Sequence, residues 1–190
     1  MLDLINKKTK GVIQIWKNYS DTIAPDVYTE LSKTSFEMIE IMTDKLEIWD
    51  GKSLDTGDKV LLYSCIGCIV EAWLRFFYCI YHNDYDKEPF EIQKKDGTKL
   101  KKSRDDIKFQ QIIEYSVNKI FQDKNDDLYK WVEKIRKLRN SIHIFNVSDF
   151  TNCDYNSDIK ELNDFIDRLC NQLPPIEDVV DEKYGDWDYR

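Results

Sequence analysis

Residues 60–81 read VLLYSCIGCIVEAWLRFFYCIY and form the most apolar stretch of the chain. Apolar side chains on nearly every side of a helix are typical of an element that packs against several neighbours. Glu71 and Arg75 lie at the middle of the stretch. Because charges at that depth are costly in a bilayer, the stretch predicts a buried central helix and no membrane span.

Outward from this helix, apolar residues recur every three to four positions, which predicts further helices. We expect them over the opening residues with a weak point near Gly11, and over about 25–49, 105–123, 126–146 and 158–173. Asp58 is the expected cap of the central helix. Asp96-Gly97 is a tight-turn signal inside the polar segment 83–104. The sequence therefore predicts an all-α fold, an up-and-down bundle of five or six helices with a small hairpin or loop insertion near 83–104.

The chain has 190 residues, which suits one domain. We expect a single helical domain over 1–173, followed by an acidic, aromatic tail over 174–190 that Trp187 and Tyr189 could dock. The five cysteines are odd in number and the N-terminus lacks the pattern of a signal peptide. These features predict a cytoplasmic protein without a disulfide framework.

The formal net charge is −8 at pH 7. Non-specific nucleic-acid binding neutralises phosphates with Lys and Arg, so this charge argues against it. A local basic cleft is still compatible with an acidic body, because electrostatic steering depends on where the charges lie.

The candidate site lies in residues 131–145, which read WVEKIRKLRNSIHIF. On a helix, Arg139 lies one turn before His143, Arg136 two turns before it, and Asn140 also about one turn before it. The four side chains are therefore predicted to share one face, while the apolar residues of the segment point into the bundle.

This set of side chains suits cleavage of a phosphodiester. Arginine offers a planar, permanently charged fork for phosphate oxygens and for charge that develops in the transition state. Histidine titrates near neutrality, so it can accept a proton from a ribose 2′-hydroxyl or donate one to the leaving oxygen. Asn140 can hold the imidazole or the substrate, and Lys130, Lys134 and Lys137 would add positive charge for substrate binding. The chemistry requires no metal ion or other cofactor.

The segment resembles the HEPN superfamily, helical proteins with an Arg and a His four to six residues apart and commonly a polar residue after the Arg. Six residues separate Arg136 from His143, whereas Arg139 is the arginine that a polar residue, Asn140, follows. The helix around Glu71 resembles an earlier apolar helix of such proteins. The resemblance covers about residues 58–173. It implies a metal-independent RNase whose cleft forms where two copies of this helix meet in a dimer.

Structural roles remain open for the same residues. His143 and its arginine neighbours could simply stabilise a helix bundle. Glu71 could pair with Arg75 within its helix, or it could reach the Arg136/Arg139 face and hold a guanidinium group. Cys65 and Cys68 could be redox or metal ligands, but a zinc site needs two more ligands, so we expect buried cysteines.

Two functions follow as expectations. The first is a HEPN-type endoribonuclease in toxin–antitoxin or anti-phage defence, active as a two-fold homodimer with helix 126–146 near the axis. The second is a non-catalytic HEPN-like module that binds a protein or senses a nucleotide, as a partner subunit or inhibitor. Tyrosine and tryptophan in the tail would suit such protein contacts. Burial of His143 together with intrachain ion pairs at both arginines would favour the second function.

Overall fold

The computed structural model describes residues 1–18, 25–141, 150–151 and 153–178. These residues form a mostly helical structure with one small antiparallel hairpin. The α-helices are α1 (Leu2–Asn18), α2 (Pro25–Ser32), α3 (Met38–Lys45), α4 (Thr56–Ile80), α5 (His82–Lys87), α6 (Phe109–Tyr115), α7 (Asp127–Ser141) and α8 (Tyr155–Cys170); the short 3₁₀ helices are η1 (Leu46–Trp49) and η4 (Ile176–Asp178); the strands are β1 (Glu91–Gln93) and β2 (Lys99–Lys101).

The predicted central helix is α4, which contacts α2, α3, α5, α6, α7, α8 and η1. It begins four residues earlier than expected, because the carboxylate of Asp55, and not that of Asp58, caps it by accepting the Asp58 N–H at 2.8 Å. Within the described residues, α4 is the one helix long and apolar enough to cross a membrane. However, 61% of its apolar 18-residue segment is buried inside the structure. A helix buried in the core of a folded domain has the same apolar composition as a membrane-spanning helix.

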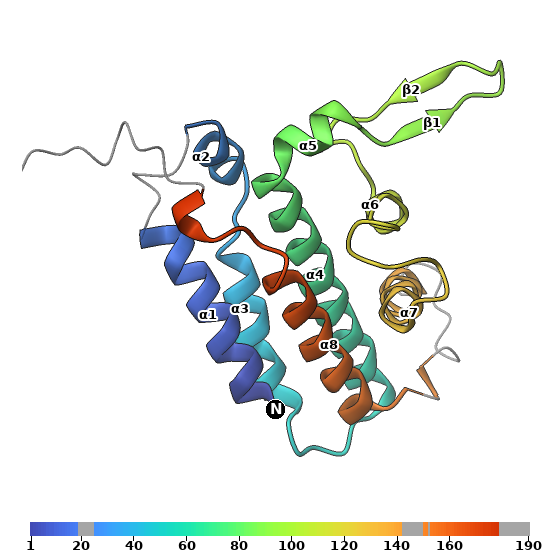
Figure 1. Cartoon of the computed structure of the whole chain (residues 1–190). Helices are drawn as coiled ribbons and strands as arrows, with labels where there is room; N and C mark the ends of the chain where they lie inside the picture. Colours follow the sequence, from blue (N-terminus) through green and yellow to red (C-terminus); the bar gives the residue numbers. More distant parts are fainter. Residues whose placement is uncertain (19–24, 142–149, 152, 179–190) are drawn as a thin grey trace, which may run out of the picture.

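Figure 1 shows α1, α3, α4 and α8 lying side by side, while α6 and α7 are seen nearly end-on beside α4. The chain colours show that α3 runs opposite to α1 and α4, whereas α8 runs in the same direction as both. The up-and-down alternation predicted from the sequence therefore describes α1, α3 and α4, but α8 does not alternate and α7 crosses α4. This crossing brings one face of α7 against the middle of α4.

The predicted insertion contains the hairpin. Glu91 pairs with Lys101 and Gln93 with Lys99 in an antiparallel register. Gly97 adopts a φ of +82°, and the Asp96 carboxylate accepts the Thr98 N–H at 3.0 Å, so the Asp-Gly turn forms as the sequence predicts. The short helix α5, ahead of the hairpin, was not expected from the sequence.

The helix predicted over 25–49 is broken into α2, α3 and η1. The hydroxyl of Ser32 donates to the Thr29 carbonyl, and the hydroxyl and N–H of Thr34 both donate to the Leu31 carbonyl. Such local hydrogen bonds compete with helix propagation, which explains the break and raises the number of helices above the predicted five or six.

Other predicted boundaries also move. The helix predicted over 105–123 is confined to α6. Lys108 has an extended backbone ahead of it, and Asn118 after it adopts a φ of 62° that a right-handed helix does not allow. The last helix starts at Tyr155, where the Asp154 carboxylate accepts the Asn156 N–H. In contrast, α1 runs through Gly11 without a break. The end of the helix predicted over 126–146 and most of the tail over 174–190 lie outside the described residues.

Candidate functional site

A close approach of α7 to α4 positions the candidate site. A Cβ atom built on Gly67 of α4 would lie 2.9 Å from Cβ and 2.8 Å from Cδ of Arg139. No other residue type fits without separating the two helices. Arg139 follows Val132 and Ile135 at helical spacing, and both of these residues are fully buried. The stem of Arg139 therefore continues the buried stripe of α7 and carries its guanidinium group across α4.

Glu71, one turn after Gly67, sits between two arginines. Its Oε1 accepts hydrogen bonds from Arg75 Nε (3.1 Å) and Nη2 (2.8 Å), and its Oε2 lies 2.7 Å from Arg139 Nη1. Arg75 also donates to the Ile107 carbonyl, and the guanidinium carbon of Arg139 lies 5.5 Å from the ring centroid of Phe109. One carboxylate between two guanidinium groups leaves this cluster with one net positive charge.

Both alternatives for Glu71 that the sequence left open are met at once, since Glu71 pairs within α4 and across to α7. Its side chain is 14% exposed, while those of Arg75 and Arg139 are 34% and 31% exposed. The carboxylate is thus largely buried, and both cations keep access to solvent. An arginine held from two sides in this way is pre-oriented for an anion.

The other predicted residues of α7 lie in different surroundings. Arg136 donates to Glu133 through Nε (3.0 Å) and Nη2 (2.9 Å), a two-point pair within α7. Asn140 and Lys137 are exposed. The structure therefore does not bring Arg136 and Arg139 onto a common partner. His143 lies outside the described residues.

Lys134, predicted to bind substrate, belongs to a buried carboxylate network. Its ammonium group lies 2.6 Å and 2.9 Å from the two oxygens of Asp158, which is 1% exposed. Asp158 also accepts hydrogen bonds from Trp131 Nε1 (2.9 Å) and from the hydroxyl of Tyr63 (2.5 Å). Burial, reinforced by the Asp158 carboxylate, raises the pKa of Tyr63 far above its usual range, so Tyr63 stays a donor. This network ties α4, α7 and α8 together.

Lys130, the third lysine predicted to bind substrate, is exposed and lies 3.3 Å from Asp127. Of the three lysines, Lys137 is therefore the one without an ion pair among the described residues. Sequence reasoning missed Gly67 and Asp158. The available signals were a glycine in the interior of an apolar helix and an aspartate at the start of a helix. These signals did not identify the contacts, because Arg139 and Lys134, the partners of the two residues, are distant from them in sequence.

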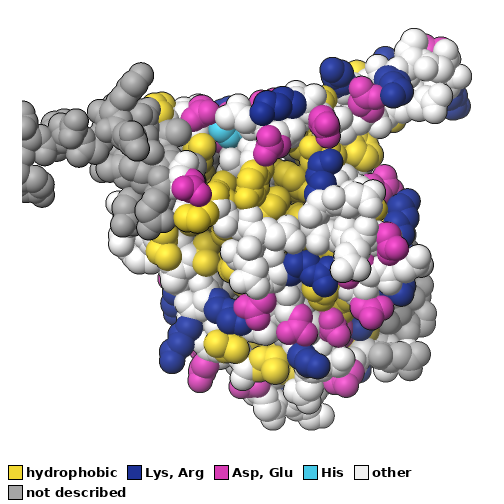
Figure 2. Space-filling view, viewed as in Figure 1, with side chains coloured by type: hydrophobic (Ala, Val, Ile, Leu, Met, Phe, Trp, Pro, Cys, Tyr) yellow, Lys and Arg dark blue, Asp and Glu magenta, His cyan; other side chains and the backbone are white. Residues whose placement is uncertain are grey.

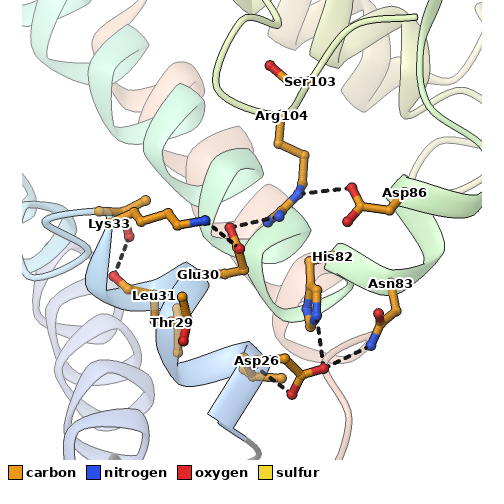
Figure 3. A network of polar contacts seen from close by, with 12 residues as sticks. Asp26, Thr29, Glu30, Leu31, Lys33, His82, Asn83, Asp86, Ser103 and Arg104 are labelled. Atoms are coloured by element: carbon orange, nitrogen blue, oxygen red, sulfur yellow. Dashed lines mark hydrogen bonds and ion pairs between the residues drawn. The ribbon is translucent and has the colours of Figure 1, made fainter.

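A second polar cluster joins α2 to α5 and to the segment after β2 (Figure 3). His82 Nε2 lies 3.0 Å from Asp26 Oδ2, which Asn83 also contacts, and Arg104 Nη2 lies 2.7 Å from Glu30 Oε2. His82 is 5% exposed. Burial tends to raise the pKa of Glu30, but hydrogen bonds from Lys33 and the charge of Arg104 outweigh it and lower that pKa. The matched charges indicate that this cluster stabilises the fold.

In the described part of the chain, no group of three or more His, Cys, Asp or Glu side chains is placed to hold a metal ion. Cys65 is buried, and its thiol lies 3.4 Å from the Met42 carbonyl oxygen. Burial raises the pKa of the Cys65 thiol to about 12, which makes it a poor nucleophile at neutral pH.

No protein-family model, no curated protein and no solved structure matches this chain. The resemblance of residues 131–145 to the HEPN superfamily therefore stays a prediction. What the geometry adds is a positively charged cluster, made of Glu71, Arg75 and Arg139, next to the exposed Asn140.

Proposed function

We propose that this chain is a HEPN-type, metal-independent endoribonuclease, acting in the cytoplasm in toxin–antitoxin or anti-phage defence. The observation that carries the proposal is the position of Arg139. A carboxylate of the central helix holds it at 2.7 Å, one residue before the exposed Asn140 and one turn before His143 in sequence. The cluster keeps one positive charge, as a phosphate site requires.

The proposed roles follow from this geometry. Arg139 binds the scissile phosphate and stabilises the charge that builds on its oxygens. His143 takes the proton of the ribose 2′-hydroxyl as that oxygen attacks phosphorus. A second proton donor protonates the departing 5′-oxygen, which leaves a 2′,3′-cyclic phosphate and a 5′-hydroxyl end. Asn140 orients the imidazole or the ribose, and Lys137 binds a neighbouring phosphate.

A homodimer supplies that second proton donor. The sequence has two histidines. His82 of α5 is buried and contacts Asp26 of α2, so one chain offers His143 alone at this site. A two-fold contact near the end of α7 would place the His143 side chains of both chains in one cleft. The contact would also bring two positively charged clusters together, and an RNA phosphate between them would relieve the repulsion.

The ion pairs of the two arginines favour a second function. Arg136 is held by Glu133 and Arg139 by Glu71, so both have intrachain partners. Ion pairs at both arginines, together with burial of His143, are the pattern expected of a non-catalytic HEPN-like module, such as a partner subunit or an inhibitor. The ion pairs are the part of this pattern that the described residues contain. In that case Arg139 holds α7 against α4, the Arg136–Glu133 pair stabilises α7 itself, and any antitoxin or other protein partner binds elsewhere.

An RNA-cleavage assay with matched variants separates the two functions. The wild type, His143→Ala, Asn140→Ala and Glu71→Gln are compared on a labelled single-stranded RNA in the presence of a chelator. Asn125→Ala is the control, because Asn125 is exposed and lies before α7. We expect cleavage by the wild type and the control, loss of at least a hundredfold for His143→Ala, and loss of about tenfold or more for the other two.

The same proteins give the opposing result if the second function is correct. In that case no variant differs from the wild type in cleavage at high protein concentration, and His143→Ala relieves no toxicity in cells. Light scattering at micromolar concentration tests the shared cleft. A strict monomer would rule that cleft out, and a dimer lost on substitution of exposed residues of α7 would support it.

A further inference from the structure

A pocket of about 220 Å³ is lined by the C-terminal end of α4, by α5, and by the end of α6 with the segment after it. Five aromatic rings line it, and neighbouring ring centroids lie between 4.7 and 6.2 Å apart. These rings belong to Phe77, Tyr78, Tyr81, Tyr85 and Tyr115. In Figure 2, hydrophobic side chains gather over the C-terminal half of α4, below α5. We call this site the aromatic pocket; it is separate from the Arg139 cluster.

The aromatic pocket is lined mainly by carbon atoms of the rings. Phe77, Tyr78 and Tyr85 are buried, so Tyr81 and Tyr115 are the rings that a bound side chain can reach. Tyr81 donates its hydroxyl hydrogen to the Gln172 carbonyl, Tyr85 donates to the Lys102 carbonyl, and the Tyr78 hydroxyl lies 3.0 Å from that of Ser116. These hydroxyl groups are therefore directed into the protein. The face of an aromatic ring carries partial negative charge, which attracts cations.

A cation of the chain itself already lies on one of these rings. The ammonium group of Lys119 is 4.5 Å from the ring centroid of Tyr115 and 3.9 Å from Glu88. Asp84 also lines the pocket, and it is paired with Lys87 at 3.6 Å in an exposed, and hence weak, ion pair. The pKa of Tyr115 is raised to about 12, mainly by burial and in smaller part by Tyr85, Glu88 and Asp84. The carboxylates of Glu88 and Asp84 are therefore close enough to Tyr115 to interact with it electrostatically.

We propose that the aromatic pocket binds the cationic side chain of an arginine or lysine from a basic segment of a partner protein. Such a side chain would lie against Tyr81 and Tyr115 with its charge toward Asp84 and Glu88, and it would compete with Lys119 for Tyr115. Charge favours this occupant. Asp84 in the lining and Glu88, which lies 3.9 Å from Lys119, attract a cation and would repel an anionic RNA, which would gain from Lys119 alone. The proposal does not depend on the nuclease.

The test is a titration of the full chain with a nine-residue arginine- and lysine-rich peptide, followed by calorimetry at low ionic strength. Lys119→Met removes the internal competitor and should tighten peptide binding about threefold. Asp84→Asn removes an attracting charge and should weaken it about threefold to tenfold. Lys99→Met and Asp127→Asn make the same charge changes at exposed positions outside the pocket and should match the wild type.

The proposal is tested by the opposite changes in peptide affinity that Lys119→Met and Asp84→Asn should cause. If the peptide binds no more tightly than an acidic peptide of equal length, or if the pocket variants only match their controls, the proposal is overturned. The proposal is also overturned if a single-stranded RNA binds in place of the peptide, and if this RNA binds more weakly to Lys119→Met and more tightly to Asp84→Asn. Such a result would mean that the pocket stacks nucleic-acid bases. Asp84 is largely exposed, so loss of fold does not confuse the result. Cleavage of RNA by the wild type is a separate measurement, so failure of either proposal is distinguishable.

Discussion

Replacement of Gly67 by alanine tests whether the close approach of α4 and α7 positions the candidate site. The added Cβ would lie 2.9 Å from Cβ of Arg139, an atom attached to the backbone of α7, so rotation of the arginine side chain cannot relieve the contact. Overpacking of this kind costs about 1–3 kcal/mol, and alanine in place of glycine within a helix returns about 1 kcal/mol. We expect Gly67→Ala to lower the free energy of unfolding by about 0–2 kcal/mol.

Gly11→Ala is the matched control. Gly11 lies inside α1, and a Cβ there would meet no atom within 4 Å. The substitution should raise the free energy of unfolding by about 0.5–1 kcal/mol, because only the helix propensity changes. Urea unfolding followed by circular dichroism measures both values, and the expected difference in the free energy of unfolding between the two variants is about 0.5–3 kcal/mol. If Gly67→Ala is stabilised as much as Gly11→Ala, the reasoning about helix contact is refuted.

Three further predictions concern stability and reactivity. Asp158→Asn should lower the free energy of unfolding by about 3 kcal/mol, since hydrogen bonds to a buried charge are lost. Lys134→Gln should cost less, about 1–3 kcal/mol, because Asp158 then stays buried without a counter-charge but keeps its hydrogen bonds from Trp131 and Tyr63. A larger loss for Lys134→Gln than for Asp158→Asn in urea unfolding would contradict this. Burial tends to raise the pKa of Asp126, but hydrogen bonds from the Gln122 N–H and from Arg168 outweigh it and lower that pKa. The stabilisation is therefore present above the unfolded pKa of about 4 and is lost as the pH falls below it, so Asp126→Asn should flatten the acid dependence of the free energy of unfolding below about pH 4. Cys65 should resist iodoacetamide at pH 8 in the native protein and react after unfolding, which peptide mass mapping measures; rapid native labelling would contradict its burial.

Local sequence was enough for the features that depend on neighbouring residues. The apolar run over 60–81 predicted α4, because burial on all sides leaves few polar positions. Asp96-Gly97 predicted a tight turn within a hairpin or loop insertion, and a hairpin forms, because glycine adopts the positive φ that the turn requires. The break after Ser32 is also local in origin, yet it was missed, since side-chain hydrogen bonds to the backbone at Ser32 and Thr34 outweighed a regular apolar pattern.

The sequence also placed Arg136, Arg139 and Asn140 on one helix, because helical spacing is fixed by the backbone. It could not determine their partners. Arg136 pairs with Glu133 three residues before it, which is a local contact within α7. Only the tertiary structure decided that Glu71 pairs with Arg139 as well as with Arg75, and that Lys134 pairs with the buried Asp158. Those contacts depend on how α7 crosses α4 and α8, and a crossing is set by the packing of side chains far apart in the chain, which helical periodicity does not encode.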